Sequence, residues 1–294
     1  MAEHVEHSQH EAHGGHEGNP LDPKELFSHV SDSPEIHVPQ VLTADRSGHI
    51  AIPQPFGSKF TVTKFRVIEL AAALILCAFF IGLAKALKGG AIPRGRFRNM
   101  LEAMLLYFRD NVARPCIGHH DADKFVPFLW TIFFFVLACN LFGMIPWMGS
   151  PTGSLAVTAT LALITFLTVM GSAVAKMGAW GTLKSLVPHM DLPLPIKIPM
   201  LFLMFPIEVL GLLIKHGVLA IRLLANMMAG HVVLAVILAF IAASAQSLWW
   251  WGVMPASVLG ATALSMLELF VAFLQAYIFT FLSALFIGMA IHPH

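Results

Sequence analysis

The chain has few charged residues for its length. Asp, Glu, Lys and Arg make up 12% of its 294 residues, whereas soluble domains carry about 25%. The formal net charge is +1, so the composition gives no sign of a basic surface for nucleic acid. Hydrophobic residues reach 57% and the mean hydropathy is +0.74, which indicates that most of the surface faces lipid. We therefore expect an all-α polytopic membrane protein.

Cysteine is also scarce. Cys77, Cys116 and Cys139 are far apart and show no CxxC spacing, which argues against a zinc site and a disulfide framework. Outside the first residues there is no cluster of metal ligands and no nucleophile–base pattern. We therefore predict no metal, no cofactor, no catalytic residue and no enzymatic activity for this chain alone.

Residues 1–60 are polar and contain a histidine at every third position from His4 to His16. Such a segment cannot bury a core, so we expect a largely disordered tail followed by an extended pre-membrane segment. Metal capture or proton buffering is the functional alternative for the histidines. The segment lacks the basic region and apolar core of a signal peptide, so internal segments are expected to direct insertion. Residues 61–294 are predicted to form the transmembrane domain.

Five apolar blocks are predicted to cross the membrane. Residues 67–87 supply the roughly 20 residues that a bilayer core requires. Residues 126–175 contain no Asp, Glu, Lys or Arg, and a turn rich in Pro and Gly near 146–153 divides them into two spans. The blocks 199–243 and 253–290 are too long for upright helices, so we expect each to be kinked or strongly tilted.

The segments between these blocks indicate the orientation. Residues 96–117 carry apolar side chains at helical spacing among charged ones, which predicts an amphipathic helix at the cytoplasmic interface. Residues 177–198 are rich in proline and are predicted to form a cytoplasmic loop. Basic residues follow the first and third spans: Lys85, Lys88, Arg94, Arg96, Arg98, Lys176 and Lys184. This distribution places the N-terminus outside and the C-terminus in the cytoplasm.

The last two blocks contain very few charges. Glu208, Lys215 and Arg222 come first, and the next charged residue is Glu268. A charge at the centre of a bilayer costs about 3 kcal/mol on insertion scales, so such residues are candidates for function. His216, next to Lys215, is more typical of an interfacial residue.

The spacing of the polar residues predicts two seams. Glu208, Lys215 and Arg222 are seven apart, and Asn226 follows Arg222 by four, so these residues line one stripe of a helix. Glu268 and Gln275 are also seven apart and share a face of the last helix. Two such seams, facing each other or a partner, would form an aqueous path through lipid.

The chemistry of these residues differs. Arg222 cannot lose its proton, so it serves as a fixed positive charge that attracts a carboxylate and repels a passing cation. His231 and Glu268 can titrate and suit a proton relay or an ion entry route. His231 lies nine residues after Arg222, about 13 Å along the helix and on its opposite face. We therefore predict two polar regions divided by Arg222.

Less specific interpretations exist for most of these positions. Glu208 and Lys215 could snorkel at the cytoplasmic interface. His231 could be a hydrogen-bonded interior histidine. Asn226 and Gln275 could form an interhelical hydrogen bond without any role in transport.

Four segments carry a resemblance to a known family. IRLLANMMAGH, from Ile221 to His231, resembles the signature of the F-type ATP synthase a subunit: an arginine, an asparagine four residues later, then a small residue and glycine. LELFVAFLQAYIFTFLSALFIGMAIHPH resembles the family's C-terminal helix. CNLFGMIPW and SPTGSLAVTATLAL resemble its second and third spans. The resemblance covers about residues 65–294, and Glu208 and Lys215 fall at the family spacing.

The resemblance implies a stator ion-channel subunit with two aqueous half-channels that pass protons to and from carboxylates of a c-subunit ring. Arg222 would separate the half-channels, and His231 and Glu268 would line the outer one. Asn226 and Gln275 would hold polar geometry near Arg222. The implied partners are the c-ring, the b subunits of the peripheral stalk and membrane lipid, with no nucleic acid. The implied location is a bacterial plasma (inner) membrane.

One feature departs from the best-known bacterial pattern, in which Glu occupies the position of His231 and His that of Glu268. The exchange supports a working pair across two helices and leaves open which residue takes the proton first. Two other hypotheses compete with the channel subunit. One is a secondary transporter with Arg222 and Glu268 as its substrate site, although no internal repeat is seen. The other is a membrane-embedded enzyme.

Overall fold

The computed structural model describes residues 35–37, 49–51, 63–87, 96–145, 150–185, 194–244 and 247–292. Before the first long helix, strands β1 (Glu35–His37) and β2 (His49–Ala51) pair in antiparallel fashion, with Ile36 opposite Ile50. The predicted His-rich tail, residues 1–18, lies outside the described residues, as does most of the segment up to residue 60.

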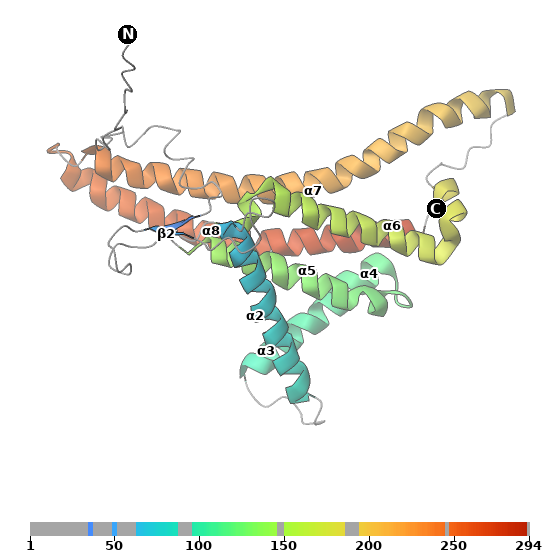
Figure 1. The fold of residues 1–294 in the computed structure, drawn as a ribbon, viewed down its shortest axis with the longest axis horizontal. Helices are drawn as coiled ribbons and strands as arrows, with labels where there is room; N and C mark the ends of the chain where they lie inside the picture. The colour runs from blue at the N-terminus through green and yellow to red at the C-terminus, as the bar shows by residue number, and fades with distance from the viewer. Residues whose placement is uncertain are drawn as a thin grey trace, which may run out of the picture.

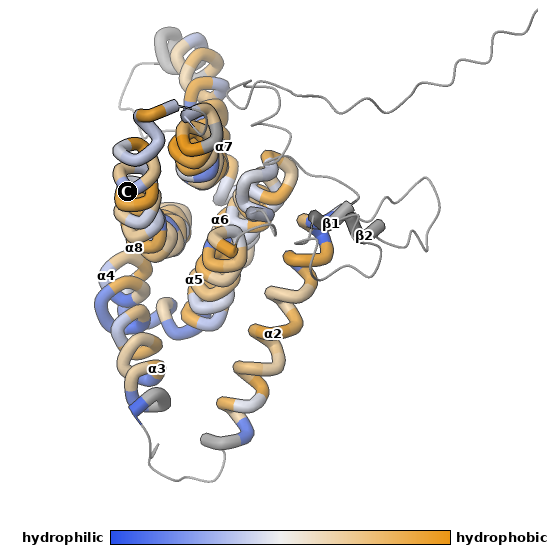
Figure 2. Tube along the Cα trace, turned by 90° about the vertical axis from the view of Figure 1, so that its left-hand side faces the viewer, coloured by the Kyte–Doolittle hydropathy of each residue, from blue (hydrophilic) through white to orange (hydrophobic). Residues whose placement is uncertain are grey.

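Within the described ranges, five helices are long and apolar enough to cross a membrane. They are α2 (Lys64–Leu87), α5 (Ala122–Gly143), α6 (Leu155–Ser185), α7 (Leu194–Ser244) and α8 (Trp250–Ile291). Apolar residues cover these helices on nearly all sides, whereas hydrophilic colour gathers around α4 and the start of α3 (Figure 2). A helix that is hydrophobic all round belongs in lipid or in a core. The predicted five crossings are confirmed.

The amphipathic segment between the first two spans is also confirmed. It runs through α3 (Arg96–Tyr107), a π-helical stretch at Phe108–Ala113 and α4 (Arg114–Ile117). Phe108, Val112 and Ala113 are buried, while Asp110 is exposed. The π-helical turn was not predicted; it widens the helix where its apolar face packs against α5 and α8.

Helices α7 and α8 form an antiparallel hairpin, and α5 and α6 pack against it (Figure 1). Helix α8 is the central element because it contacts α4, α5, α6 and α7. Small side chains allow this close packing: Ala272, Ala276 and Ala284 have no exposed surface. Helix α2 contacts α5 and runs across the direction of α7 and α8, which Figure 2 shows end-on.

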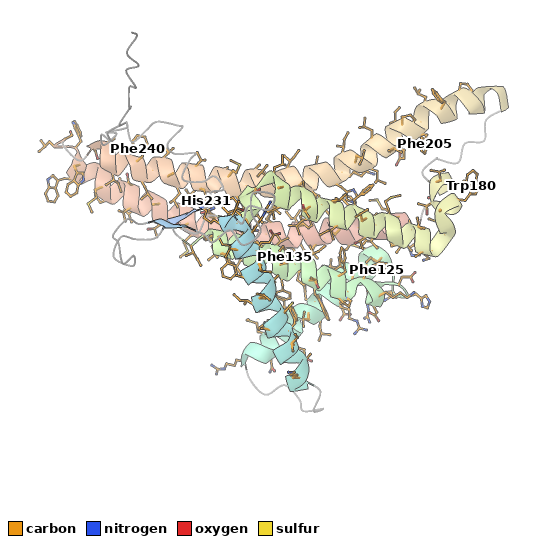
Figure 3. All side chains as sticks on the ribbon, in the orientation of Figure 1. Phe125, Phe135, Trp180, Phe205, His231 and Phe240 are labelled. Atoms are coloured by element: carbon orange, nitrogen blue, oxygen red, sulfur yellow. The ribbon has the colours of Figure 1, made fainter. Side chains whose placement is uncertain are left out.

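The last two helices are longer than a bilayer core requires. Helix α7 has 51 residues and α8 has 42. At 1.5 Å per residue these lengths are about 76 Å and 63 Å, against a core of ~30 Å, so both helices are far longer than an upright crossing needs. Helix α7 also bends in its N-terminal part, where the arm that carries Phe205 rises away from α8 (Figure 3).

The predicted loop at 177–198 is shorter than expected. Helix α6 continues to Ser185 through a break at Gly178, whose φ of 76° is a left-handed conformation that glycine adopts at no steric cost. The turn after the break carries Trp180 away from the helix (Figure 3). Helix α7 then begins at Leu194 despite Pro195, because the first turn of a helix tolerates proline.

Candidate functional site

Polar side chains from α7 and α8 meet in the middle of the hairpin. The Asn226 amide Nδ2 donates a hydrogen bond of 2.8 Å to Gln275 Oε1. Further along, His231 Nδ1 lies 3.7 Å from Glu268 Oε1. Because the helices are antiparallel, residues later in α7 lie opposite residues earlier in α8. The predicted seam of Glu268 and Gln275 therefore faces α7.

The pair of His231 and Glu268 is largely removed from solvent, with side-chain exposures of 15% and 7%. At 3.7 Å the two side chains are close enough for an ion pair but not for a hydrogen bond. His231 Nε2 and Glu268 Oε1 are both buried without a hydrogen-bond partner within the described residues. Buried polar atoms are normally satisfied, so these two are available to a water molecule or a transferred proton.

Gly230 makes room for the Glu268 carboxylate. A Cβ atom at position 230 would lie 2.7 Å from Glu268 Oε1 and 3.1 Å from the carboxyl carbon. Any side chain there would displace the carboxylate. The absence of a side chain at Gly230 therefore allows the Glu268 carboxyl group of α8 to approach the backbone of α7.

A second polar layer lies beside this pair. Gln275 is 1% exposed. One turn earlier on α8, the carbonyl oxygen of Ala272 accepts a hydrogen bond of 3.3 Å from Asn140 Nδ2. Thr152 Oγ1 donates to Asn140 Oδ1 at 2.8 Å. Sequence reasoning assigned no role to Asn140 or Thr152. A signal was present, because Asn140 is the single side-chain amide in the uncharged stretch 126–175.

Arg222 lies one helical turn before Asn226 and is half-buried. It makes no hydrogen bond and no ion pair with any residue of the described ranges. Its neighbours Leu219 and Leu223 are buried, whereas Val218 and Ile221 are exposed. The guanidinium is therefore a charge without a carboxylate partner in this part of the chain.

On the other side of Arg222, a cavity of about 180 Å³ opens between α6, α7 and α8. Helix α7 contributes Glu208, Lys215 and His216 to its lining, and α6 contributes Thr182 and Ser185. The structure therefore brings Glu208 and Lys215 together at one cavity. It places them away from His231, which Figure 3 shows on the other half of α7 from Phe205.

His216 has different surroundings from its neighbour Lys215. Its ring is 5% exposed and is packed between aromatic rings. Sequence reasoning assumed that a residue next to the exposed Lys215 would share its surroundings. Neighbours on a helix point about 100° apart, so Lys215 can be exposed while His216 is buried between rings of α6 and α8.

An ion-pair network fixes the charged ends of the helices near this cavity. Asp121 accepts hydrogen bonds from Lys176 at 2.6 Å and from Lys124 at 3.0 Å. These bonds lower the pKa of Asp121 to about 2. Arg109 forms a two-pronged bond to Asp123, at 2.8 and 3.0 Å. The network ties the start of α5 to α6 and to the π-helical stretch.

Comparison with known proteins agrees with this arrangement. The family model for the ATP synthase A chain matches residues 67–288. The chain belongs to this family. Its members are membrane channel subunits of ATP synthase and not the catalytic ones, and proton transport follows from the family. The chain is thus a multi-pass membrane protein of an ATP synthase, which decides against the transporter and enzyme hypotheses.

Several relatives are similar over most of their length. ATP synthase subunit a of Myxococcus xanthus (strain DK1622) is 42% identical over 238 residues, which is 80% of this chain and 75% of the relative. That of Chloroherpeton thalassium (strain ATCC 35110 / GB-78) is 41% identical over 238 residues, 80% of this chain and 68% of the relative. That of Anaeromyxobacter sp. (strain Fw109-5) is 39% identical over 266 residues, 88% of this chain but 62% of the relative.

Proposed function

We propose that this chain carries two aqueous half-channels of an F-type ATP synthase and that Arg222 keeps them apart. Protons would enter from one side of the membrane, bind carboxylates on a rotating c-ring beside α7 and α8, and leave on the other side. The observation that carries the proposal is the position of Arg222. It is a charge without a partner among the described residues, between two separate polar regions on one helix.

The outer half-channel is proposed at His231 and Glu268. Both can gain and lose a proton, and their unpartnered buried atoms suit contact with water. The hydrogen bond from Asn226 to Gln275 holds the two helices in register between this pair and Arg222. The two side chains are adjacent, so a proton that binds to either one can be transferred to the other and then toward the ring.

The inner half-channel is proposed at the cavity lined by Glu208 and Lys215. These residues lie about 21 Å and 10 Å before Arg222 along α7. The polar lining from Thr182 and Ser185 can hydrate the path. In this arrangement Glu208 and Lys215 act at the cytoplasmic exit and are not merely snorkelling side chains.

Arg222 supplies the separation through electrostatics. A guanidinium and a carboxylate 4 Å apart attract each other by about 4 kcal/mol at an effective dielectric constant of about 20. A ring carboxylate that passes Arg222 would therefore be held ionised and give up its proton. The same charge repels a proton that moves directly from one half-channel to the other.

The remaining assignments follow from the same proposal. The location is the bacterial inner membrane, with the N-terminus outside and the C-terminus in the cytoplasm, as the basic residues around α6 indicate. The partners are the c-ring along α7 and α8, the b subunits of the peripheral stalk, and lipid around the exposed apolar side chains. The five helices supply a scaffold on which both half-channels are built.

Cysteine accessibility tests the two half-channels. The assembled complex would carry Glu208→Cys or His231→Cys in a background in which Cys77, Cys116 and Cys139 are replaced by Ser. A membrane-impermeant thiol reagent should label position 208 from the cytoplasmic side and position 231 from the outer side. The proposal would be overturned if the reagent labelled both positions from the same side. It would also be overturned if the reagent labelled neither position from either side.

A further inference from the structure

His216 is a buried titratable residue to which neither the family resemblance nor the half-channel account gives a role. Its side chain lies between two aromatic rings, with centroid distances of 5.2 Å to Phe166 of α6 and 4.9 Å to Phe286 of α8. The ring is 5% exposed and is part of the lining of the cavity that also holds Glu208. Aromatic packing on both sides fixes the imidazole plane in one orientation.

The hydrogen bond of the ring determines which nitrogen is basic. Nδ1 lies 2.9 Å from the carbonyl oxygen of Leu212, one turn earlier on α7. A carbonyl oxygen can only accept, so Nδ1 carries the hydrogen and donates it. In the neutral ring Nε2 is then the free base. Nε2 is buried and has no hydrogen-bond partner among the described residues.

The position of His216 suits a step between the cavity and Arg222. Glu208 and His216 are eight residues apart on one face of α7, about 12 Å along the axis, and Arg222 lies about 9 Å further on. Groups from all three helices face the cavity. Helix α7 contributes the charged Glu208 and Lys215, α6 contributes Thr182 and Ser185, and α8 contributes the apolar Phe286, Met289 and Ala290.

We propose that His216 carries protons in the inner half-channel. The inference rests on the half-channel account and adds one residue to the inner half-channel. A protonated ring carboxylate that approaches Arg222 loses its proton, through water, to His216 Nε2, which leaves a carboxylate and an imidazolium. The imidazolium then gives that proton to water or to the Glu208 carboxylate in the cavity.

The test compares two substitutions in the assembled complex. His216→Phe keeps an aromatic ring between Phe166 and Phe286 but cannot carry a proton, and His216→Gln keeps a polar side chain without an aromatic ring. Leu74→Ile changes an exposed apolar residue of α2, outside the cavity lining, and introduces no titratable group. ATP-driven proton pumping, in which the same relay runs in reverse from the cavity to the ring, would be measured in inverted vesicles from pH 5 to 8 and normalised to assembled complexes. In such vesicles the medium sets the pH on the cytoplasmic face.

We expect Leu74→Ile to reproduce the natural pH profile. A positioned acid–base group contributes about 100-fold or more to a proton-transfer step, and since rotation also limits the rate we expect both His216 variants to pump about tenfold more slowly. Both should also lose the part of the pH dependence that comes from protonation of His216. If one variant fails to assemble, the other still decides. An unchanged rate and profile in an assembled variant would overturn the role of His216.

A third variant, Arg222→Ala, separates this inference from the half-channel account. If Arg222→Ala abolishes pumping while both His216 variants pump normally, the half-channel account stands and His216 has no part in it. If Arg222→Ala pumps normally, the half-channel account itself fails, whatever the His216 variants do.

Discussion

His231 on α7 and Glu268 on α8 face each other with 3.7 Å between Nδ1 and Oε1. The two residues are 37 positions apart in sequence and meet because the antiparallel hairpin aligns them. Neither residue can be buried cheaply as a lone charge, whereas a proton shared between them lowers that cost. This relationship makes the two positions interdependent.

Exchanging the two residues tests that interdependence. His231→Glu alone places two carboxylates together, and Glu268→His alone places two imidazoles together. We expect either single change to lower ATP-driven proton pumping by about 100-fold. The double exchange restores one acid and one base, so it should recover at least about tenfold, a coupling of the size seen between residues in contact. Pumping in the double variant no better than in the worse single variant would show that the two positions act independently.

Gly230→Ala tests the close approach of Glu268 to α7. The new Cβ would lie 2.7 Å from Glu268 Oε1, so the carboxylate must move. A displacement of about 1 Å can cost up to about 100-fold in a positioned reaction step, so we expect a large loss of pumping in complexes that still assemble. Gly171→Ala is the matched control, because a Cβ there meets nothing within 4 Å. Equal pumping in the two variants would argue against a positioned carboxylate.

Asp121 gives a pH-dependent contribution to stability. Its pKa is lowered to about 2 in the folded protein by bonds from Lys176 and Lys124. A lowered pKa means that the contribution is fully present above the ordinary value near 4 and is lost as the pH falls toward 2. We expect Asp121→Asn to lower the thermal unfolding midpoint of the purified complex at pH 7. The difference in unfolding midpoint between the variant and the natural protein should shrink between pH 4 and pH 2. A difference that grows on acidification would contradict this assignment.

Much of the fold was predictable from hydropathy and charge. The five crossings, the amphipathic segment and the excess length of α7 and α8 follow from local composition, which a membrane constrains strongly. The break at Gly178 and the π-helical turn at Phe108–Ala113 did not follow. The π-helical turn lies where the segment packs against α5 and α8, which local sequence does not reveal, and a glycine inside an apolar stretch does not by itself predict a break.

The spacing in the sequence suggested candidate site residues, whose roles stay predictions, but it did not indicate how the structure groups them. Spacing placed Glu208, Lys215, Arg222 and Asn226 on one stripe. The structure divides that stripe, because Asn226 bonds to Gln275 while Glu208 and Lys215 line a cavity. The division depends on the register between α7 and α8 and on where α6 ends. Residues whose role depends on that register, such as His216, could not be found from spacing alone.

Replacement of Arg222 is the most direct test of the account. Arg222→Ala and the charge-retaining Arg222→Lys would be compared in inverted vesicles that contain the assembled complex, with ATP-driven pumping and passive proton leak measured in the same preparation. The account predicts that Arg222→Ala abolishes pumping and raises the leak, because nothing then separates the half-channels. Arg222→Lys should limit the leak but pump poorly, since an ammonium can lose its proton and a guanidinium cannot. Normal pumping without leak in Arg222→Ala would contradict the central claim.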